Sequence, residues 1–123
     1  MTRRTLTLAT IVLAFAGCVQ PAYDRTVIYD LDVSALKDVK TVGIRGSDSP
    51  LSWERDSTLA PVVKDSLYRV VITYRTGYLI TQAKFTVNGE FELKDGENRR
   101  ITFAKGDANG DTTIYRARFN QPQ

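Results

Sequence analysis

Residues 79–94 read LITQAKFTVNGEFELK and contain the clearest structural pattern in the chain. Apolar and polar residues alternate along the first half, and this alternation places Phe85 on the apolar face of a strand. The Asn-Gly pair at 88–89 tolerates the positive φ angles that a two-residue β-turn needs. The stretch therefore predicts a β-hairpin, with strands at residues 79–87 and 90–94.

The rest of the chain also gives mainly strand patterns. Alternating or β-branched apolar segments occur at residues 26–33, 39–44, 67–74, 99–104 and 112–119. Turn residues separate these segments, residues 52–64 form a long connection without a clear period, and no convincing long helix is found. About seven short strands at this spacing predict an all-β protein, an antiparallel immunoglobulin-like β-sandwich.

The residue types that carry most enzyme chemistry are scarce. The sequence has no histidine, its single cysteine is Cys18, and neither a nucleophile elbow nor a P-loop occurs. Two carboxylate pairs have the spacing of neighbours on one strand face: Asp30 with Asp32, and Glu90 with Glu92. We interpret them as solvated residues, because a glycosidase needs two carboxylates facing each other across a cleft. We expect no enzyme activity and no cofactor.

Residues 107–111 read DANGD, which offers oxygen ligands at alternate positions, as calcium loops do. Glycine stands at the fourth place and no glutamate closes the loop at the twelfth, so the rest of an EF-hand is missing. The same residue types build tight turns. We therefore expect a turn here and no metal site.

The N-terminus is typical of a secretory signal peptide. Arg3 and Arg4 form a basic segment, and the uncharged apolar run at residues 6–16 is short for a bilayer span. Losing both arginines leaves the mature chain nearly neutral, with interspersed charges, so we expect no nucleic-acid partner. The expected organisation is a signal peptide at 1–17, a tether at 18–25, a β-sandwich at 26–120 and a tail at 121–123.

Residues 13–18 read LAFAGC and resemble a bacterial lipoprotein box, with Phe15 where leucine is usual. The resemblance implies that Cys18 is lipidated and becomes the first residue of the mature chain. Several acyl chains would anchor the protein stably, because each buried methylene contributes about 0.8 kcal/mol. Val19 rather than aspartate follows the cysteine, which favours the outer membrane. Ordinary secretion with a free thiol is the alternative.

The only tryptophan, Trp53, follows a loop rich in Gly, Ser, Asp and Pro and precedes three charged residues. A tryptophan buried in the core is common in β-sandwiches. A flat indole at a loop edge also suits sugar binding, because the C–H faces of a pyranose stack on it. Both interpretations stay open from these residues.

Three segments resemble starch-binding domains, the family-20 carbohydrate-binding modules and their relatives. In chain order they are VGIRGS with PLSW at 42–53, AKF at 83–85 and ELKDGENR at 92–99. The resemblance implies a glucan site in which Trp53, Lys84 and Asn98 match the family's first tryptophan, strand lysine and asparagine. Leu93 stands where the family has a second tryptophan, and Phe91 lies two positions earlier on the same face.

Together, the resemblances imply a non-catalytic, lipid-anchored carbohydrate-binding module at the bacterial cell envelope. In this hypothesis an α-glucan or other polysaccharide stacks on Trp53, while Lys84 and Asn98 bond its hydroxyl groups. The alternative is a structural or protein-interaction lipoprotein with the same fold and a degenerate sugar site. An exposed Trp53 beside Lys84 and Asn98 would favour sugar binding, whereas a Trp53 sealed in the core would favour the alternative.

Overall fold

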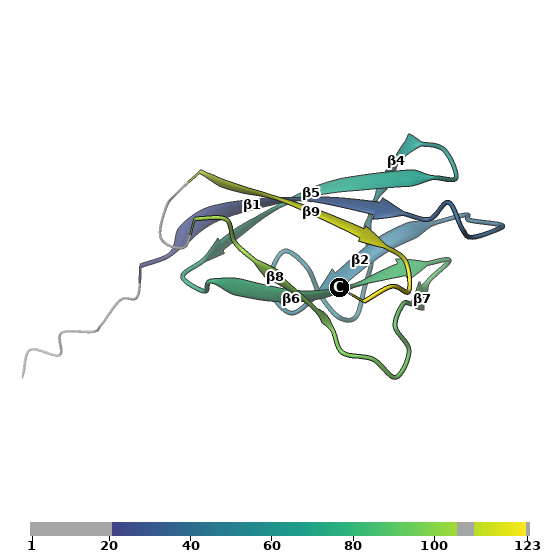
Figure 1. The fold of residues 1–123 in the computed structure, drawn as a ribbon. Coiled ribbons are helices and arrows are strands. Elements are labelled where there is room, and N and C mark those ends of the chain that lie inside the picture. Colours follow the sequence, from purple (N-terminus) through teal and green to yellow (C-terminus); the bar gives the residue numbers. More distant parts are fainter. Residues whose placement is uncertain (1–20, 106–109, 123) are drawn as a thin grey trace, which may run out of the picture.

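The computed structural model describes residues 21–105 and 110–122, which form two facing β-sheets (Figure 1). Sheet A has the strand order β4-β5-β1-β9, and sheet B has the order β3-β2-β6-β7, with β8 also pairing with β6. The expected all-β sandwich is confirmed. The strands are β1 (Tyr23–Asp32), β2 (Val42–Gly46), β3 (Ser57–Thr58), β4 (Ala60–Val63), β5 (Leu67–Thr76), β6 (Ile80–Val87), β7 (Glu90–Phe91), β8 (Arg99–Thr102) and β9 (Asp111–Arg118).

Three parts of the strand pattern differ from the sequence-based expectation. β1 begins at Tyr23, so the sheet takes up the last three residues of the segment expected to be a tether. The expected connection at 52–64 contains β3 and β4, and β4 is exposed at every position, so it has no buried face to produce an apolar period. The returning strand expected at 90–94 is only β7, because the chain leaves the sheet after Phe91.

One strand pair departs from an antiparallel sandwich. β1 and β9 run parallel, in a register from Arg25 opposite Asp111 to Asp32 opposite Arg118. β8, which precedes β9 in the chain, lies in sheet B, whereas β9 lies in sheet A. The connection between the two strands therefore crosses from one sheet to the other and does not form a hairpin. Parallel neighbours require such a crossover.

The turn at residues 88–89 confirms the hairpin prediction. Asn88 and Gly89 have φ angles of 52° and 79°, both positive as a type I′ turn requires. The Asn88 side-chain oxygen also accepts the amide N–H groups of Lys40 and Thr41 at 2.7 and 3.1 Å. This residue therefore joins the hairpin to the chain just before β2.

The inward faces of both sheets form one apolar core. Tyr29 on β1 meets Phe85 on β6 edge to face, with ring centroids 6.1 Å apart, so aromatic contact links the two sheets. Burial of these side chains is the main favourable term in folding. Buried members include Val27, Tyr29, Leu31, Val42, Ile44, Ile72, Tyr74, Ala83, Phe85 and Ile101.

Two carboxylates that we expected to be solvated are buried: Asp30 is 4% exposed and Glu92 is fully buried. The solvated interpretation is therefore wrong for both. Arg69 donates to the two oxygens of Asp30 at 2.6 and 2.9 Å. These hydrogen bonds lower the pKa of Asp30 and compensate for its burial.

Several expectations concern residues outside the described ranges: the signal peptide at 1–17, the lipidated Cys18, most of the turn at 107–111, and the final residue of the tail. Within residues 21–105 and 110–122, the chain forms no helix long and apolar enough to cross a membrane. The same residues contain no group of three or more acidic, histidine or cysteine side chains arranged to hold a metal ion.

Two tyrosines share a hydrogen bond inside the core. The hydroxyl oxygens of Tyr29 and Tyr74 are 2.7 Å apart, so each hydroxyl has a partner. Burial raises the pKa of both groups from the usual value of 10.0, that of Tyr74 to about 12. The unfolded chain therefore releases these protons at lower pH than the folded chain does.

This difference predicts that stability falls at alkaline pH. The free energy of unfolding should be insensitive to both tyrosines below about pH 10. Above that it should decline by up to about 1.4 kcal/mol per pH unit for each tyrosine, because ionisation favours the unfolded chain. Urea unfolding at several pH values from about 8 to 11 measures the slope. Tyr29→Phe/Tyr74→Phe should flatten the profile, whereas the exposed control Tyr78→Phe should not. An equally steep decline in the double variant would contradict the assignment.

Candidate functional site

The three residues expected to form a site are associated with the outer face of sheet B. Along β6, Phe85 points into the core, so by alternation Lys84 points outward. Asn98 donates its side-chain N–H to Gln82 at 3.1 Å, and Gln82 has the same outward parity as Lys84. Trp53 follows β2 and contacts residues of β2 and β7.

Trp53 is neither sealed in the core nor fully exposed: it is half-buried. Its ring centroid lies 6.5 Å from that of Phe91, and the two ring planes are tilted by 53°. The Arg45 guanidinium lies 4.9 Å from the centroid of the Phe91 ring and donates to the Trp53 carbonyl at 3.2 Å. We call Trp53 and Phe91 the aromatic platform.

Asp56 holds the segment after Trp53 against the sheet. One of its carboxylate oxygens accepts hydrogen bonds from Arg45 and Thr86, at 2.8 and 2.9 Å. Gly43 makes this close packing feasible, because a Cβ at that position would lie 2.7 Å from atoms of both Asp56 and Thr86. A side chain at position 43 would therefore displace Asp56 or Thr86.

Lys84 has a structural role in the loop at residues 92–98. Its ammonium group donates to the carbonyl oxygens of Leu93 and Gly96, both at 3.0 Å. An ammonium group has three N–H donors, and these two bonds use two of them. Lys84 therefore fixes the loop that carries Asn98.

Leu93, which stands where the family pattern has its second tryptophan, lies in the loop after β7. It has a positive φ of 48°, and its amide N–H donates to the Asn120 side chain at 2.8 Å. Phe91 provides the neighbouring ring instead. The hairpin register explains this, because Phe91 pairs with Thr86, whose side chain faces away from the core side of β6.

The structure brings the expected residues onto one face without joining them directly. Among the described residues, no hydrogen bond or ring contact links Trp53, Lys84 and Asn98 to one another. An open groove of about 1000 Å³ includes Asn98 in its lining, but neither Trp53 nor Lys84. Its lining includes Phe91, Leu93, Asn98, Tyr115, Phe119 and Asn120.

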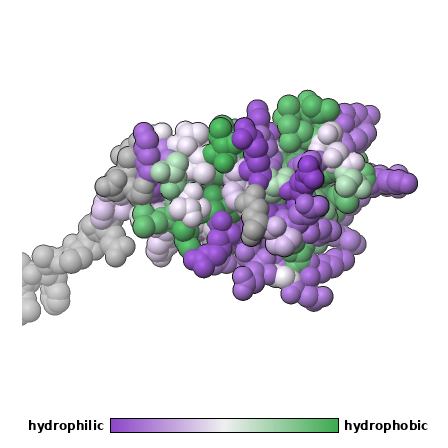
Figure 2. All heavy atoms as spheres, viewed as in Figure 1, coloured by the Kyte–Doolittle hydropathy of each residue, from purple (hydrophilic) through white to green (hydrophobic). Residues whose placement is uncertain are grey.

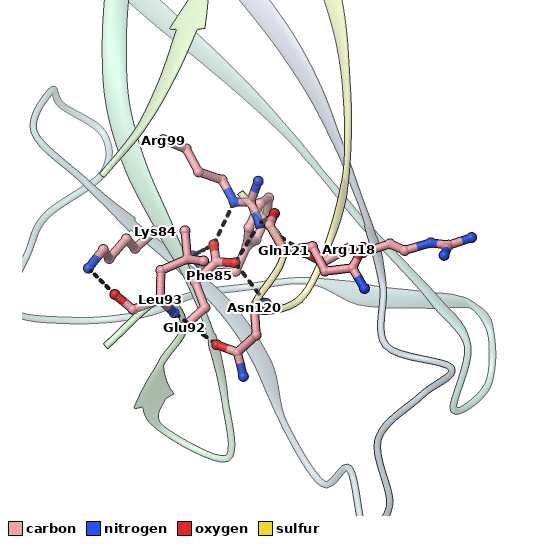
Figure 3. Close-up of polar contacts among 8 residues, drawn as sticks. All are labelled: Lys84, Phe85, Glu92, Leu93, Arg99, Arg118, Asn120 and Gln121. Carbon is pink, nitrogen blue, oxygen red and sulfur yellow. Dashed lines mark hydrogen bonds and ion pairs between the residues drawn. The ribbon is translucent and has the colours of Figure 1, made fainter. Parts of the chain in front are cut away.

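A buried ion pair that the sequence analysis missed orders the same loop (Figure 3). Arg99 donates through Nε and Nη2 to the two carboxylate oxygens of Glu92, at 2.8 and 2.7 Å. Glu92 also accepts the Phe85 amide N–H at 2.8 Å. Phe85 lies between the part of β6 that pairs with β7 and the part that pairs with β8, so the Glu92 side chain takes the place of a strand partner there. Burial is the largest single influence on the pKa of Arg99 and would lower it, but the hydrogen bonds and charge interactions with Glu92 and Tyr115 together outweigh burial and raise it.

The ion pair also ties sheet B to the end of β9 and to the residues that follow it. Arg99 Nη2 donates to the carbonyls of Arg118 and Gln121 at 2.9 and 2.8 Å, and the Asn120 amide donates to Glu92 at 3.3 Å (Figure 3). The 88–89 turn could have revealed the inward position of Glu92 from sequence. A two-residue turn sets position 92 opposite Phe85, and Phe85 faces the core.

We predict that Glu92→Gln destabilises the protein strongly, because it leaves Arg99 as a buried cation without a counter-charge. The expected loss in the free energy of unfolding is about 3–5 kcal/mol, measured by urea denaturation. Glu90→Gln is the matched control, since Glu90 is 75% exposed and its ion pair with Lys94 spans 3.6 Å. That control should lose less than about 1 kcal/mol. Similar losses in the two variants would contradict the proposed importance of the buried pair.

Comparison with known proteins assigns no family to this chain. No protein-family model matches it, and a search of curated proteins gives no match. The fold therefore follows from the structure alone, and the likeness to starch-binding domains remains a resemblance in the segments quoted above.

Proposed function

We propose that this protein is a non-catalytic carbohydrate-binding module, lipid-anchored at the bacterial cell envelope, that binds α-glucan or a related polysaccharide. The observation that carries the proposal is the aromatic platform of Trp53 and Phe91 on the outer face of sheet B. Both rings are half-buried, so they are held in place while part of their surface stays accessible.

The geometry of the platform suits a chain of sugar rings. Pyranose C–H faces stack on aromatic rings, and polar groups beside the rings bond the hydroxyls. The 53° tilt between Trp53 and Phe91 fits consecutive sugars whose ring planes differ in direction, as they do in curved α-glucans. Arg45 lies against both platform residues and offers guanidinium donors at its edge.

The other expected residues then take distinct roles. Lys84 positions the loop and has a third N–H donor for a sugar hydroxyl. Asn98 is exposed and lines the groove that also includes Phe91. In the proposed complex, a glucan chain stacks on Trp53 and Phe91 and extends along the groove toward Asn98.

A second candidate function, docking of an envelope protein, is favoured by the outer face of sheet A. Ile28 pairs with Val71 on β5 and with Ile114 on β9, so three apolar residues form one row across the sheet. Val71 and Ile114 are 55% and 54% exposed. A row of this kind on a β-sheet suits contact with another protein.

Sugar binding can be tested by fluorescence, because Trp53 is the only tryptophan. Titration of residues 21–123 with maltoheptaose should give a saturable change in emission. Phe91→Ala should weaken binding by about 1–3 kcal/mol, or roughly 5- to 150-fold in Kd, through loss of one stacking ring. The control Tyr78→Ala removes a 66% exposed aromatic ring elsewhere and should leave the Kd unchanged. No change at millimolar ligand, together with no retention on insoluble starch, would refute the α-glucan proposal.

The lipid anchor makes a separate prediction. The full chain expressed in a bacterium should incorporate labelled palmitate and partition with the membrane fraction, because acyl chains on Cys18 hold it there. Cys18→Ala should lose the label and appear in the soluble fraction. A variant that stays with the membranes, or a native chain without label, would contradict lipidation.

A further inference from the structure

The connection between β5 and β6 lies at the end of the domain where β1 begins (Figure 1). Tyr23, the first residue of β1, pairs with Thr76, the last residue of β5. The backbones of Gly77 and Pro21 lie close together next to this pair, because a Cβ on Gly77 would be only 2.5 Å from the carbonyl oxygen of Pro21. We call residues 77–79 the β5–β6 tip. The start of the described chain is therefore packed directly against the tip.

The tip presents two large side chains to solvent. Tyr78 is 66% exposed and Leu79 is 57% exposed. Their backbone is held, because the Tyr78 amide donates to the Thr76 hydroxyl and the Leu79 carbonyl accepts the Phe103 amide, both at 3.0 Å. Figure 2 shows hydrophobic surface at this end of the domain. The exposure is thus a property of an ordered turn.

The tip lies close to the proposed site of lipidation. Only Val19 and Gln20 lie between Cys18 and Pro21. An extended chain spans at most about 3.5 Å per residue, so the three steps from Cys18 to Pro21 cover roughly 11 Å. A lipid on Cys18 would therefore bring the tip to the membrane surface. Tyrosine and leucine suit that surface, because the tyrosine ring is apolar with a polar hydroxyl and leucine enters the acyl boundary.

We propose that the β5–β6 tip is a membrane-contact site, in which Tyr78 and Leu79 rest in the interface of the bilayer that holds the lipid anchor. The inference depends on the anchor proposed above. The apolar side chains make this contact, and Arg75 beside the tip is paired with Asp24 at 3.3 Å. The contact should therefore form on uncharged lipid as well.

Exposed apolar residues elsewhere are poorly placed for this contact. Val63 is 55% exposed, but it pairs with Leu67 at the opposite end of β5. Ten residues of strand, about 33 Å, separate that end from the tip. Val63 therefore provides a matched control of similar exposure.

The test places the sole indole at either end of the domain. Leu79→Trp and Val63→Trp are each made in a Trp53→Phe background, in the chain that begins at Cys18. Every described strand lies at or after Tyr23, so this chain keeps the whole described fold. Its only thiol is coupled to a maleimide lipid in phosphatidylcholine vesicles, which makes the measurement independent of lipidation in cells.

The expected result is a blue-shifted emission for Leu79→Trp, with quenching by doxyl-labelled lipid at least about twofold stronger than for Val63→Trp. Equal quenching of the two indoles would overturn the proposal. A second measurement uses the unsubstituted chain: amide hydrogen exchange of residues 77–80 should slow on vesicles, while that of residues 60–63 should not. Unchanged exchange at the tip would also overturn it. Failure of the anchor itself is detected separately, by the cellular fractionation of Cys18→Ala.

Discussion

The bidentate ion pair of Glu92 and Arg99 connects more of this structure than any other polar contact described above. It fills the gap along β6 between β7 and β8, where the Phe85 amide would otherwise be buried without a partner. Arg99 also donates to the carbonyl of Arg118, the last residue of β9, and to that of Gln121 beyond it. Burying two charges is costly, and the cost is offset only because both groups make several further hydrogen bonds. The two sheets are therefore joined by hydrogen bonds from a buried charged group as well as by an apolar core.

The positions of residues in the candidate site depend on this ion pair. Phe91 comes directly before Glu92, and neighbouring residues of an extended chain point to opposite faces. Because the Glu92 carboxylate points inward, the Phe91 ring points outward, beside Trp53. The loop that follows is closed from the other side by Lys84. A lysine that sequence resemblance assigned to ligand binding thus has a structural role in this loop. Phe91 therefore comes just before a loop that Arg99 and Lys84 both hold in place.

The sequence predicted the sandwich, the 88–89 turn and the apolar side of β6, because each depends on local alternation or turn chemistry. It failed where a polar residue faces inward: alternation marks Glu92 as solvated, although the hairpin register sets it opposite Phe85. The parallel pairing of β1 with β9 was also missed, because residues some 86 positions apart carry no local pattern for it. The sugar site expected at Trp53, Lys84 and Asn98 stays a prediction, and the ring that lies beside Trp53 is Phe91.

The direction of β6 determines how sheet B would be oriented if many copies of this protein were anchored to one membrane. β6 starts at the tip and runs away from it, so a module standing on the tip would turn the outer face of sheet B sideways. A polymer lying along the membrane could then touch several modules in succession. Each added contact is intramolecular once the first has formed, so avidity would multiply a weak single-site affinity. In that arrangement, the density of modules on the surface governs retention of the polymer.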